Sequence, residues 1–419
     1  MRTKASWIGD HVPTLLNVNN YHYRRGGADV MHLEQSRLFR TEGWEVVDFA
    51  MRHPDNLDSP WSDYFVDEIE FGRDYSFRER AVAAGRVVHS PQARRRIGDL
   101  IDRTRPDIAH LHNVYHHISP SILPTLHRRG VPTVLTTHDL KLACPAYRMI
   151  TDDAICERCK GGRIHNVIRR RCIKDSAVLS SVVFAETALH RTMGTFARCV
   201  DRFISPSRFY IDKFVEWGFD ASQFVRIPNY VRPDDFMPAE KAGRDVVYLG
   251  RLAPEKGLAT LVSAVHTAGV ALTIAGTGPD HDALRQQAAS LGAEVTFLGH
   301  VGGPDLHDLV RSARAVVLPS EWYENAPVSV LEAYALATPV VGASIGGITE
   351  LVQPGRTGWL FRSGDVGDLA DALRVVRQTP DATIVEMGRA GRSWVEEEFT
   401  DRHYLERTLD VYRSIGVQC

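Results

Sequence analysis

The sequence lacks the features that would mark a membrane-spanning, secreted or nucleic-acid-binding protein. Its longest apolar-leaning run, Ala177 to Leu189, carries two serines, a glutamate and a threonine, and it is too short to cross a bilayer. The first residues, Met1 to Ser6, are too polar for the core of a signal peptide. The net charge of -2 provides no overall basic field to hold nucleic acid. We therefore expect a cytoplasmic protein with small-molecule partners, which could be peripheral to the inner face of the membrane.

Short-period repeats and low-complexity segments are also missing from the 419 residues, which suffice for two or three domains. A hydrophobic content of 44% and a charged content of 24% are typical of soluble globular proteins. Strand-like and helix-like segments alternate along the chain, which predicts an α/β fold with parallel sheets. The predicted strands lie at 12–19, 45–49, 107–112, 131–137, 202–207, 225–229, 245–250, 271–275, 295–298, 315–318 and 339–342.

A polar link with two prolines, Arg232 to Arg244, divides these strands into two sets. Both sets show the same alternation, so the two halves share an architecture without detectable sequence similarity. We predict an N-terminal domain over 1–235, a C-terminal domain over 236–398 and a final helical segment over 399–419.

Cysteine is scarce, yet four of the six cysteines fall between positions 144 and 172. They are Cys144, Cys156, Cys159 and Cys172, and the middle two form a Cys-x-x-Cys pair. In a cytosolic protein such a set favours a metal over disulfides, and four thiolates suit a tetrahedral structural zinc. The spacing differs from that of a zinc ribbon, which has two Cys-x-x-Cys pairs, so reduced thiols or a redox pair remain alternatives. We treat about 140–175 as an insert in the N-terminal domain.

Basic residues crowd the same insert. They are Arg158, Lys160, Arg163, Arg169, Arg170, Arg171 and Lys174. The simpler interpretation, which we favour, is a solvated face beside a core helix. The alternative is a surface that holds an anionic acceptor, such as a lipid-linked sugar phosphate, or that contacts a membrane.

The most informative stretch contains two glutamates, Glu324 and Glu332, separated by seven residues. The apolar run at 315–318 predicts a buried strand before them, and Pro327 predicts the first position of a helix between them. That edge of an open α/β sheet binds ligands, and a helix N-terminus there offers free N–H groups to a phosphate. The arrangement suits a sugar nucleotide, with Glu332 accepting hydrogen bonds from ribose hydroxyls and Glu324 near the sugar.

A second group of candidate residues follows the strand predicted at 245–250. Gly250 ends that strand, and Arg251 and Lys256 supply two cations on the loop after it. Paired cations can stabilise the charge of a leaving diphosphate without a metal. We therefore expect no catalytic metal. Gly276-Thr277-Gly278 lacks the third glycine of a dinucleotide fingerprint and predicts a tight turn instead.

In the first half, Gly26 and Gly27 precede a predicted helix and either contact a phosphate or form a plain turn. Histidines follow two of the predicted strands: His112, His116 and His117 follow one, and His138, with Asp139 beside it, follows the other. An edge His-Asp pair facing an interdomain cleft is well placed for a functional role. The other three histidines either line the part of that cleft where a second substrate, the acceptor, would bind, or are ordinary loop residues.

Together with Pro339-Val340-Val341-Gly342 and Gly346-Gly347-Ile348-Thr349-Glu350, the Glu-x7-Glu segment resembles the donor motif of family 4 glycosyltransferases. The resemblance covers roughly 12–400 and is strongest over 245–352. It implies a GT-B fold, in which two Rossmann-like parallel-sheet domains face each other across a cleft and the last helix returns to the first domain. The family often carries Gly-Gly-x-Glu where this chain has Asp29, so the reach of that acid differs.

The resemblance also implies roles for the candidate residues. The catalytic group would be His138, Glu324, Arg251 and Lys256. The donor site would comprise Gly26, Gly27, Gly250, Arg251, Lys256, Gly276, Glu324, Val328, Ser329 and Glu332. The acceptor side would comprise His112, His116, His117 and Asp139. His138 would contact the transferred sugar, while Arg251, Lys256 and the amides near Val328 would hold the diphosphate. Retention of configuration would follow from attack on the same face while the diphosphate leaves.

We therefore expect a retaining glycosyltransferase of hexosyl type that moves a sugar from a nucleoside-diphosphate sugar to a hydroxyl of a glycan, lipid-linked glycan or small glycoside, as in polysaccharide biosynthesis. One alternative is a sugar-nucleotide epimerase or hydrolase on the same fold. Another is a non-catalytic relative that binds nucleotide sugars.

Overall fold

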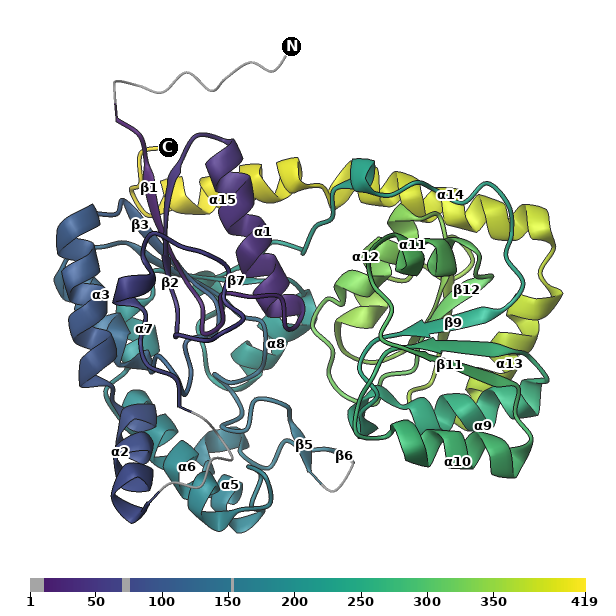
Figure 1. Cartoon of the computed structure of the whole chain (residues 1–419), viewed down its shortest axis with the longest axis horizontal. Helices are drawn as coiled ribbons and strands as arrows, with labels where there is room; N and C mark the ends of the chain where they lie inside the picture. Colours follow the sequence, from purple (N-terminus) through teal and green to yellow (C-terminus); the bar gives the residue numbers. More distant parts are fainter. Residues whose placement is uncertain (1–10, 70–75, 152–153) are drawn as a thin grey trace.

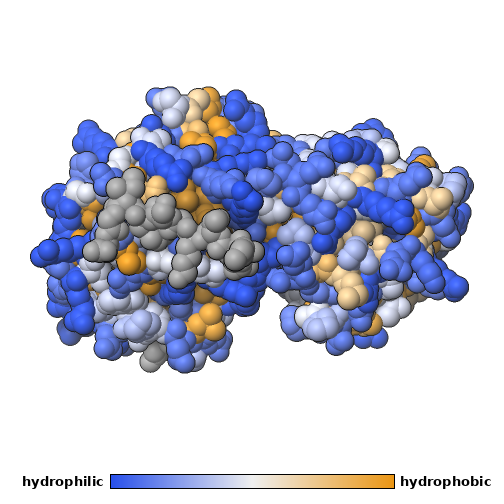
Figure 2. Space-filling view, turned by 90° about the horizontal axis from the view of Figure 1, so that it is seen from above, coloured by the Kyte–Doolittle hydropathy of each residue, from blue (hydrophilic) through white to orange (hydrophobic). Residues whose placement is uncertain are grey.

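The computed structural model describes residues 11–69, 76–151 and 154–419, and they form two lobes (Figure 1). Each lobe contains a six-stranded parallel sheet with helices on its faces. This confirms the predicted α/β class with two Rossmann-like domains. Figure 2 shows a narrow waist between the lobes and a mostly hydrophilic surface on the face seen there. No helix in the described ranges is both long and apolar enough to span a membrane.

The N-terminal sheet has the strand order β2-β1-β3-β4-β7-β8. Its strands are β1 (Thr14–Val18), β2 (Glu45–Phe49), β3 (Ile108–Leu111), β4 (Thr133–Thr136), β7 (Arg202–Ser205) and β8 (Phe224–Arg226). Its helices are α1 (Gly27–Thr41), α2 (Phe77–Val88), α3 (Pro91–Thr104), α4 (Leu123–Arg128), α6 (Ala177–Thr192), α7 (Thr195–Cys199) and α8 (Arg208–Glu216). The strands are short apolar runs because helices cover both faces of the sheet. Between β4 and α6, the insert adds the antiparallel pair β5 (Ile150–Thr151) and β6 (Ala154–Ile155) and the one-turn α5 (Asn166–Arg169).

The C-terminal sheet has the order β11-β10-β9-β12-β13-β14. Its strands are β9 (Val246–Leu249), β10 (Leu272–Ala275), β11 (Val295–Gly299), β12 (Ala315–Leu318), β13 (Val340–Ala343) and β14 (Gly358–Phe361). Its helices are α9 (Leu258–Ala268), α10 (His281–Leu291), α11 (Gly303–Arg311), α12 (Val328–Ala335), α13 (Val366–Gln378) and α14 (Asp381–Glu398). The strand order reverses between β9 and β12, and such a switch point opens a crevice at the carboxyl ends of the strands.

The two lobes are joined by hydrogen bonds between loops at the facing sheet edges. Asn325 accepts a hydrogen bond from Ser207 Oγ (2.7 Å) and donates one to the carbonyl of Thr137 (2.9 Å). Glu350 accepts hydrogen bonds from the backbone N–H groups of Arg208 (2.9 Å) and Phe209 (2.7 Å). These N–H groups open α8, where a carboxylate is favoured by the helix dipole. The carboxyl edges of the two sheets therefore face each other.

The last helix, α15 (Asp401–Ser414), lies on the N-terminal lobe (Figure 1). The Tyr412 hydroxyl is 2.7 Å from Nδ1 of His110, which is fully buried on β3. The Tyr404 hydroxyl accepts a hydrogen bond from Gln35 Nε2 (3.0 Å), and Gln35 also contacts His110. A chain segment that begins in the C-terminal lobe is thus fastened to the core of the other lobe.

Tyr412→Phe removes one buried hydrogen bond and keeps the ring, so the free energy of unfolding of the N-terminal lobe should fall by about 0.5–1.5 kcal/mol. Urea unfolding measures it. Tyr147→Phe is the control, because its half-exposed hydroxyl makes no hydrogen bond to a described residue, and it should change stability by less than about 0.5 kcal/mol. Equal shifts for both variants would contradict the anchoring role.

Candidate functional site

The loops that follow β9 and β12 meet at the switch point of the C-terminal sheet. The Glu321 N–H donates to the carbonyl of Glu255 (3.0 Å), which ties the two loops together. Gly257 must be a glycine, because a Cβ there would lie 2.0 Å from the carbonyl oxygen of Pro319. This close approach brings the side chain that precedes Gly257, Lys256, against the β12 loop.

Lys256 and Glu324 form a partly buried ion pair in this crevice. Lys256 Nζ donates to Glu324 Oε1 (2.7 Å), and Ser320 Oγ donates to the same oxygen (2.8 Å). Burial would raise the pKa of Glu324, but the positive charge of Lys256 and these hydrogen bonds outweigh it and hold the pKa below its ordinary value. Glu324 is therefore a carboxylate at neutral pH, and the charge of Lys256 is neutralised in the absence of a ligand.

Arg251, the second predicted cation, is placed differently. Its side chain is exposed and forms no hydrogen bond or ion pair with a described residue, although its backbone carbonyl accepts a hydrogen bond from the Tyr248 hydroxyl (2.8 Å). The structure therefore brings Lys256 and Glu324 together and leaves Arg251 at the mouth of the crevice.

Gly250 and Gly276 pack against each other, since a Cβ on Gly276 would lie 1.8 Å from the carbonyl oxygen of Gly250. Gly276 also has φ +153, a region that side chains disfavour. A Cβ on Gly278 would lie 2.0 Å from the carbonyl oxygen of Leu252. The Gly-x-Gly turn thus allows two loops to pack at the sheet edge, whether or not a ligand contacts it.

Helix α12 begins at Val328, four residues after the Glu324 of the ion pair. Pro327 has extended backbone angles and is the N-cap, so the prediction that it occupies the first helical position is wrong by one residue. Proline offers no capping side chain, and the N–H groups of Val328 and Ser329 have no hydrogen-bond partner in the described chain. The first turn of α12 is therefore free to bind an anion.

Glu332 lies on the fifth residue of α12 and is half-buried. Burial raises the pKa of its carboxyl group, and its oxygens accept no hydrogen bond from any residue that the structure describes. Such a carboxylate gains stability when hydroxyl donors reach it.

In the N-terminal lobe, α1 begins at a glycine pair with open space above it. Nothing lies within 4 Å of a Cβ built on Gly27, and one on Gly26 would meet only Asp29, at 3.8 Å. Gly26 caps α1 without a side-chain hydrogen bond. Asp29 is buried and accepts a hydrogen bond from Asn19 Nδ2 (2.9 Å), so the shorter acid holds the loop to β1 and does not extend outward.

His138 ends a chain of buried hydrogen bonds. Its Nε2 lies 2.7 Å from His112 Nδ1, and His112 Nε2 lies 2.8 Å from Gln35 Oε1. Because the amide oxygen only accepts, His112 donates from Nε2 and accepts at Nδ1, so His138 carries its proton on Nε2. Burial lowers the pKa of His138 to about 4, which keeps it neutral at pH 7 with an Nδ1 lone pair available to a hydroxyl donor.

The remaining acceptor-side candidates are more dispersed. Burial raises the pKa of Asp139 to about 6, and its side chain accepts from the Lys141 N–H (2.9 Å). His117 Nε2 lies 3.2 Å from the Tyr21 hydroxyl, beside the Gly26 loop. His116 Nδ1 lies 3.7 Å from a carboxylate oxygen of Glu186 on α6. The structure thus brings His112 next to His138 and directs His116 into the interior of the lobe.

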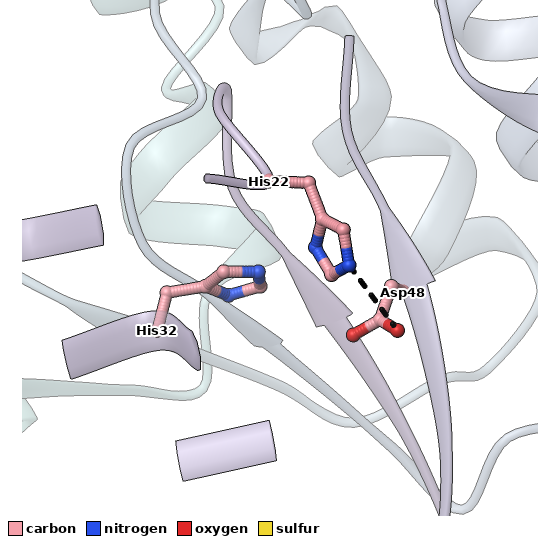
Figure 3. Close-up of side chains that lie close together, drawn as sticks. All are labelled: His22, His32 and Asp48. Atoms are coloured by element: carbon pink, nitrogen blue, oxygen red, sulfur yellow. Dashed lines mark ion pairs between the residues drawn. The ribbon is translucent and has the colours of Figure 1, made fainter. Parts of the chain in front are cut away.

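His22, His32 and Asp48 form a cluster of potential metal ligands (Figure 3). It lies near the His138–His112 hydrogen bond, since the His32 ring packs against His112. The ligand atoms of the cluster lie within 4.8 Å of one another, and His22 Nε2 is 3.9 Å from Asp48 Oδ2. Asp48, however, already accepts hydrogen bonds from Arg40 (2.5 Å) and Ser36 (3.1 Å). The guanidinium neutralises the carboxylate and would repel a cation, so we assign no metal to this group.

Several residues of the site carried no signal in the sequence. Gln35 hydrogen-bonds His112, and it is held in turn by His110, which contacts Tyr412 from 302 positions away. Asn325 and Glu350 fell within the recognised motif, but their contacts cross between the lobes. Such contacts leave no local pattern.

The model described as Glycosyltransferase Family 4 matches residues 25–235, and the model described as Glycosyl transferases group 1 matches residues 243–378. The alpha-maltose-1-phosphate synthase of Mycolicibacterium smegmatis is 29% identical over 334 residues, 74% of this chain and 79% of that protein. The glycogen synthase of Mycobacterium tuberculosis is 35% identical over 202 residues, 46% of each chain.

A further relative is the GDP-mannose-dependent alpha-(1-6)-phosphatidylinositol monomannoside mannosyltransferase of Mycobacterium tuberculosis, 34% identical over 202 residues, 43% of this chain and 50% of that protein. The match thus spans about half the length of the last two relatives. Among solved structures, sucrose-phosphate synthase from Thermosynechococcus elongatus has a TM-score of 0.69 at 20% identity, covering 97% of this chain and 99% of that one.

The structure of Anabaena HepE in complex with UDP has a TM-score of 0.68 at 16% identity, covering 96% of this chain and 100% of that one. At these identities the solved structures show the fold alone, which is the two-domain GT-B arrangement. Both halves of the chain match glycosyltransferase models, and the protein belongs to glycosyltransferase family 4.

Proposed function

We propose that the protein is a retaining glycosyltransferase that moves a hexosyl group from a nucleoside-diphosphate sugar to a hydroxyl of a glycan, lipid-linked glycan or small glycoside. The observation that carries the proposal is the first turn of α12: among the described residues its N–H groups and the carboxylate of Glu332 have no hydrogen-bond partner, and in the chain they follow the Glu324 that pairs with Lys256. A diphosphate and a ribose need these two kinds of partner. The relatives named as synthases and mannosyltransferases, and the solved structure with UDP, support the same donor class.

In this proposal the diphosphate lies on the amides of Val328 and Ser329 and attracts Lys256 away from Glu324. Arg251, exposed at the mouth of the crevice, closes on the same phosphates. The two cations and the helix dipole then stabilise the charge that develops as the diphosphate leaves, so no catalytic metal is needed. Glu332 accepts hydrogen bonds from the ribose hydroxyls.

The transferred sugar lies between Glu324 and His138. Neutral His138 accepts a hydrogen bond from a sugar hydroxyl at Nδ1, and Glu324 accepts another once Lys256 has moved. The acceptor hydroxyl attacks the anomeric carbon on the face that the diphosphate leaves, the C–O bond to the diphosphate breaks, and a phosphate oxygen takes the acceptor proton. Positioning and fixed charges provide the rate enhancement.

The acceptor would approach beside the insert. A cavity of about 320 Å³ lies between Arg148, Arg170 and Arg171 of the insert and Glu255 and Glu321 of the C-terminal lobe. Although the sequence alone favoured a solvated face for the insert, the three arginines outnumber the two glutamates of this cavity. They suit an acceptor that carries phosphate as well as hydroxyl groups, such as a lipid-linked sugar phosphate, presented by a membrane to a peripherally bound cytoplasmic enzyme.

The direct test measures release of nucleoside diphosphate from UDP-, GDP- and ADP-sugars with and without candidate acceptors. We expect release to increase with an acceptor and the product to retain the anomeric configuration, which NMR reports. Release that is independent of every acceptor would favour the hydrolase or epimerase alternative. No release, together with tight nucleotide binding, would favour a non-catalytic relative.

Glu332→Gln keeps the size of the side chain and removes its charge, so the affinity for the nucleoside diphosphate should fall by roughly 1.5–3 kcal/mol, or about 10- to 150-fold. Calorimetric titration measures it. The matched control is Glu386→Gln, an exposed glutamate on α14, which should leave the affinity unchanged. A folded Glu332→Gln protein with wild-type affinity would overturn the ribose assignment.

Lys256→Ala should lower kcat by roughly 100-fold or more, because stabilisation of the leaving diphosphate acts in the transition state. It also leaves Glu324 buried without its cation, so the pKa of Glu324 should rise and the acid limb of the pH–rate profile should move to higher pH. Steady-state kinetics across pH measure both effects. Lys241→Ala, at an exposed site in the linker, serves as control. A normal kcat in Lys256→Ala would contradict the role.

A further inference from the structure

The four cysteines of the insert surround one small cavity. Cys144, Cys156, Cys159 and Cys172 all line a space of about 10 Å³, and all are free thiols. Three separate stretches of chain supply them: the loop after β4, the Cys-x-x-Cys turn after β6 and the segment after α5. The sulfur atoms are not grouped within 4.8 Å of one another among the described residues, so a shared ion would draw them inward to a metal–sulfur distance of about 2.3 Å.

The surroundings of the cavity fit a tetrathiolate centre. Binding a divalent cation releases four thiol protons, and the centre then carries a net charge of about 2-. Arg158 and Arg170 line the cavity, and Arg191 donates to the carbonyls of Leu142 (3.1 Å) and Ala143 (2.9 Å), next to Cys144. These guanidinium groups supply the opposite charge.

The insert has little else to hold its shape. Among the described residues, its α-helix has four residues, its 3-10 helix (Lys160–Gly162) has three and its strands have two each. Of the nine described residues other than glycine with positive φ, five lie here: Tyr147, Met149, Arg171, Lys174 and Asp175. Such backbone persists only where the surroundings over-determine it, and a four-ligand metal provides that constraint.

The Cys-x-x-Cys turn also reaches the donor side of the crevice. Glu157, between the two cysteines, accepts hydrogen bonds from the Tyr323 hydroxyl (3.1 Å) and from Lys213 Nζ (2.8 Å). Tyr323 immediately precedes Glu324. At the other end of the cluster, Cys144 follows the His138 loop, where its N–H donates to the carbonyl of Leu140 (2.7 Å). The cysteine cluster thus joins the loops that carry His138 and Glu324.

We propose that Cys144, Cys156, Cys159 and Cys172 bind one structural zinc-class divalent cation, and that the metal-held turn positions the Glu324 loop through the contact of Glu157 with Tyr323. The first half stands on the cysteine cluster alone, whereas the second half rests on the proposed donor site. Glu157 is a positioning residue and touches no substrate.

The metal is tested by elemental analysis of the full chain, purified without chelator or metal-affinity resin. We expect about one zinc per chain in the wild type and in the control Cys419→Ser, and roughly tenfold less in Cys159→Ser. If Cys159→Ser fails to fold, chelation of the wild type replaces it: hydrogen exchange should rise in the insert before it rises in the C-terminal sheet. A wild type that contains no zinc, whether its four cysteines titrate as thiols or as disulfides, would overturn the metal site.

The positioning role is tested with Glu157→Gln, Tyr323→Phe and the double variant. Each single change should preserve the zinc content and weaken binding of the preferred nucleoside diphosphate, among UDP, GDP and ADP, by roughly 3- to 10-fold, and the double change should weaken it no further. Glu216→Gln is the matched control, because Glu216 pairs with the same Lys213 but does not contact Tyr323, and it should have no effect.

Additive effects, or an equal loss in Glu216→Gln, would overturn the positioning role and leave the metal in place. A wild type that binds zinc but none of the three nucleotides would overturn the proposed function and the positioning role together. The zinc measurement therefore separates a failure of the metal from a failure of the donor site.

Discussion

The backbone of Glu324 and Asn325 is held from both lobes, and the geometry of the candidate site depends on this constraint. The Gly347 N–H donates to the carbonyl of Glu324 (2.8 Å), and a Cβ on Gly347 would lie 1.6 Å from the carbonyl oxygen of Asn325. The Asn325 side chain reaches Thr137 and Ser207 in the other lobe. Because α12 starts three residues later, the same contacts set the direction of its N-terminus and the distance across the crevice.

The charge pair of Lys256 and Glu324 is the second constraint on the site. A buried carboxylate such as Glu324 is stable only with a partner of opposite charge, and Lys256 is that partner. Glu324 lies four residues before the start of α12, so the same lysine lies on the side of the crevice where that helix begins. In the proposed function a diphosphate and Glu324 compete for this one charge, which would couple nucleotide binding to the release of Glu324 toward the sugar. On the opposite lobe, burial keeps His138 neutral and a hydrogen-bond acceptor.

The fold could largely be predicted from the sequence, whereas the contacts that hold the site residues in place could not. Apolar runs such as 315–318 predicted the buried strands because parallel strands are apolar on both faces. The strand at 358–361 was not predicted, because after Gly358 its apolar run is only three residues long. Glu324 and Glu332 were recognised because they share a local motif, and Lys256 because it follows a predicted strand together with Gly250 and Arg251. The contact of Glu157 with Tyr323 and that of His110 with Tyr412 join residues far apart in sequence, which no period or spacing records.

The most direct test of the account is a crystal structure of the protein with a bound nucleoside diphosphate. We expect phosphate oxygens within about 2.7–3.2 Å of the N–H groups of Val328 and Ser329, Lys256 Nζ on the phosphates instead of on Glu324, and ribose hydroxyls on Glu332. A nucleotide bound elsewhere, or one bound here with the Lys256–Glu324 pair intact and Glu332 still without a partner, would contradict the account.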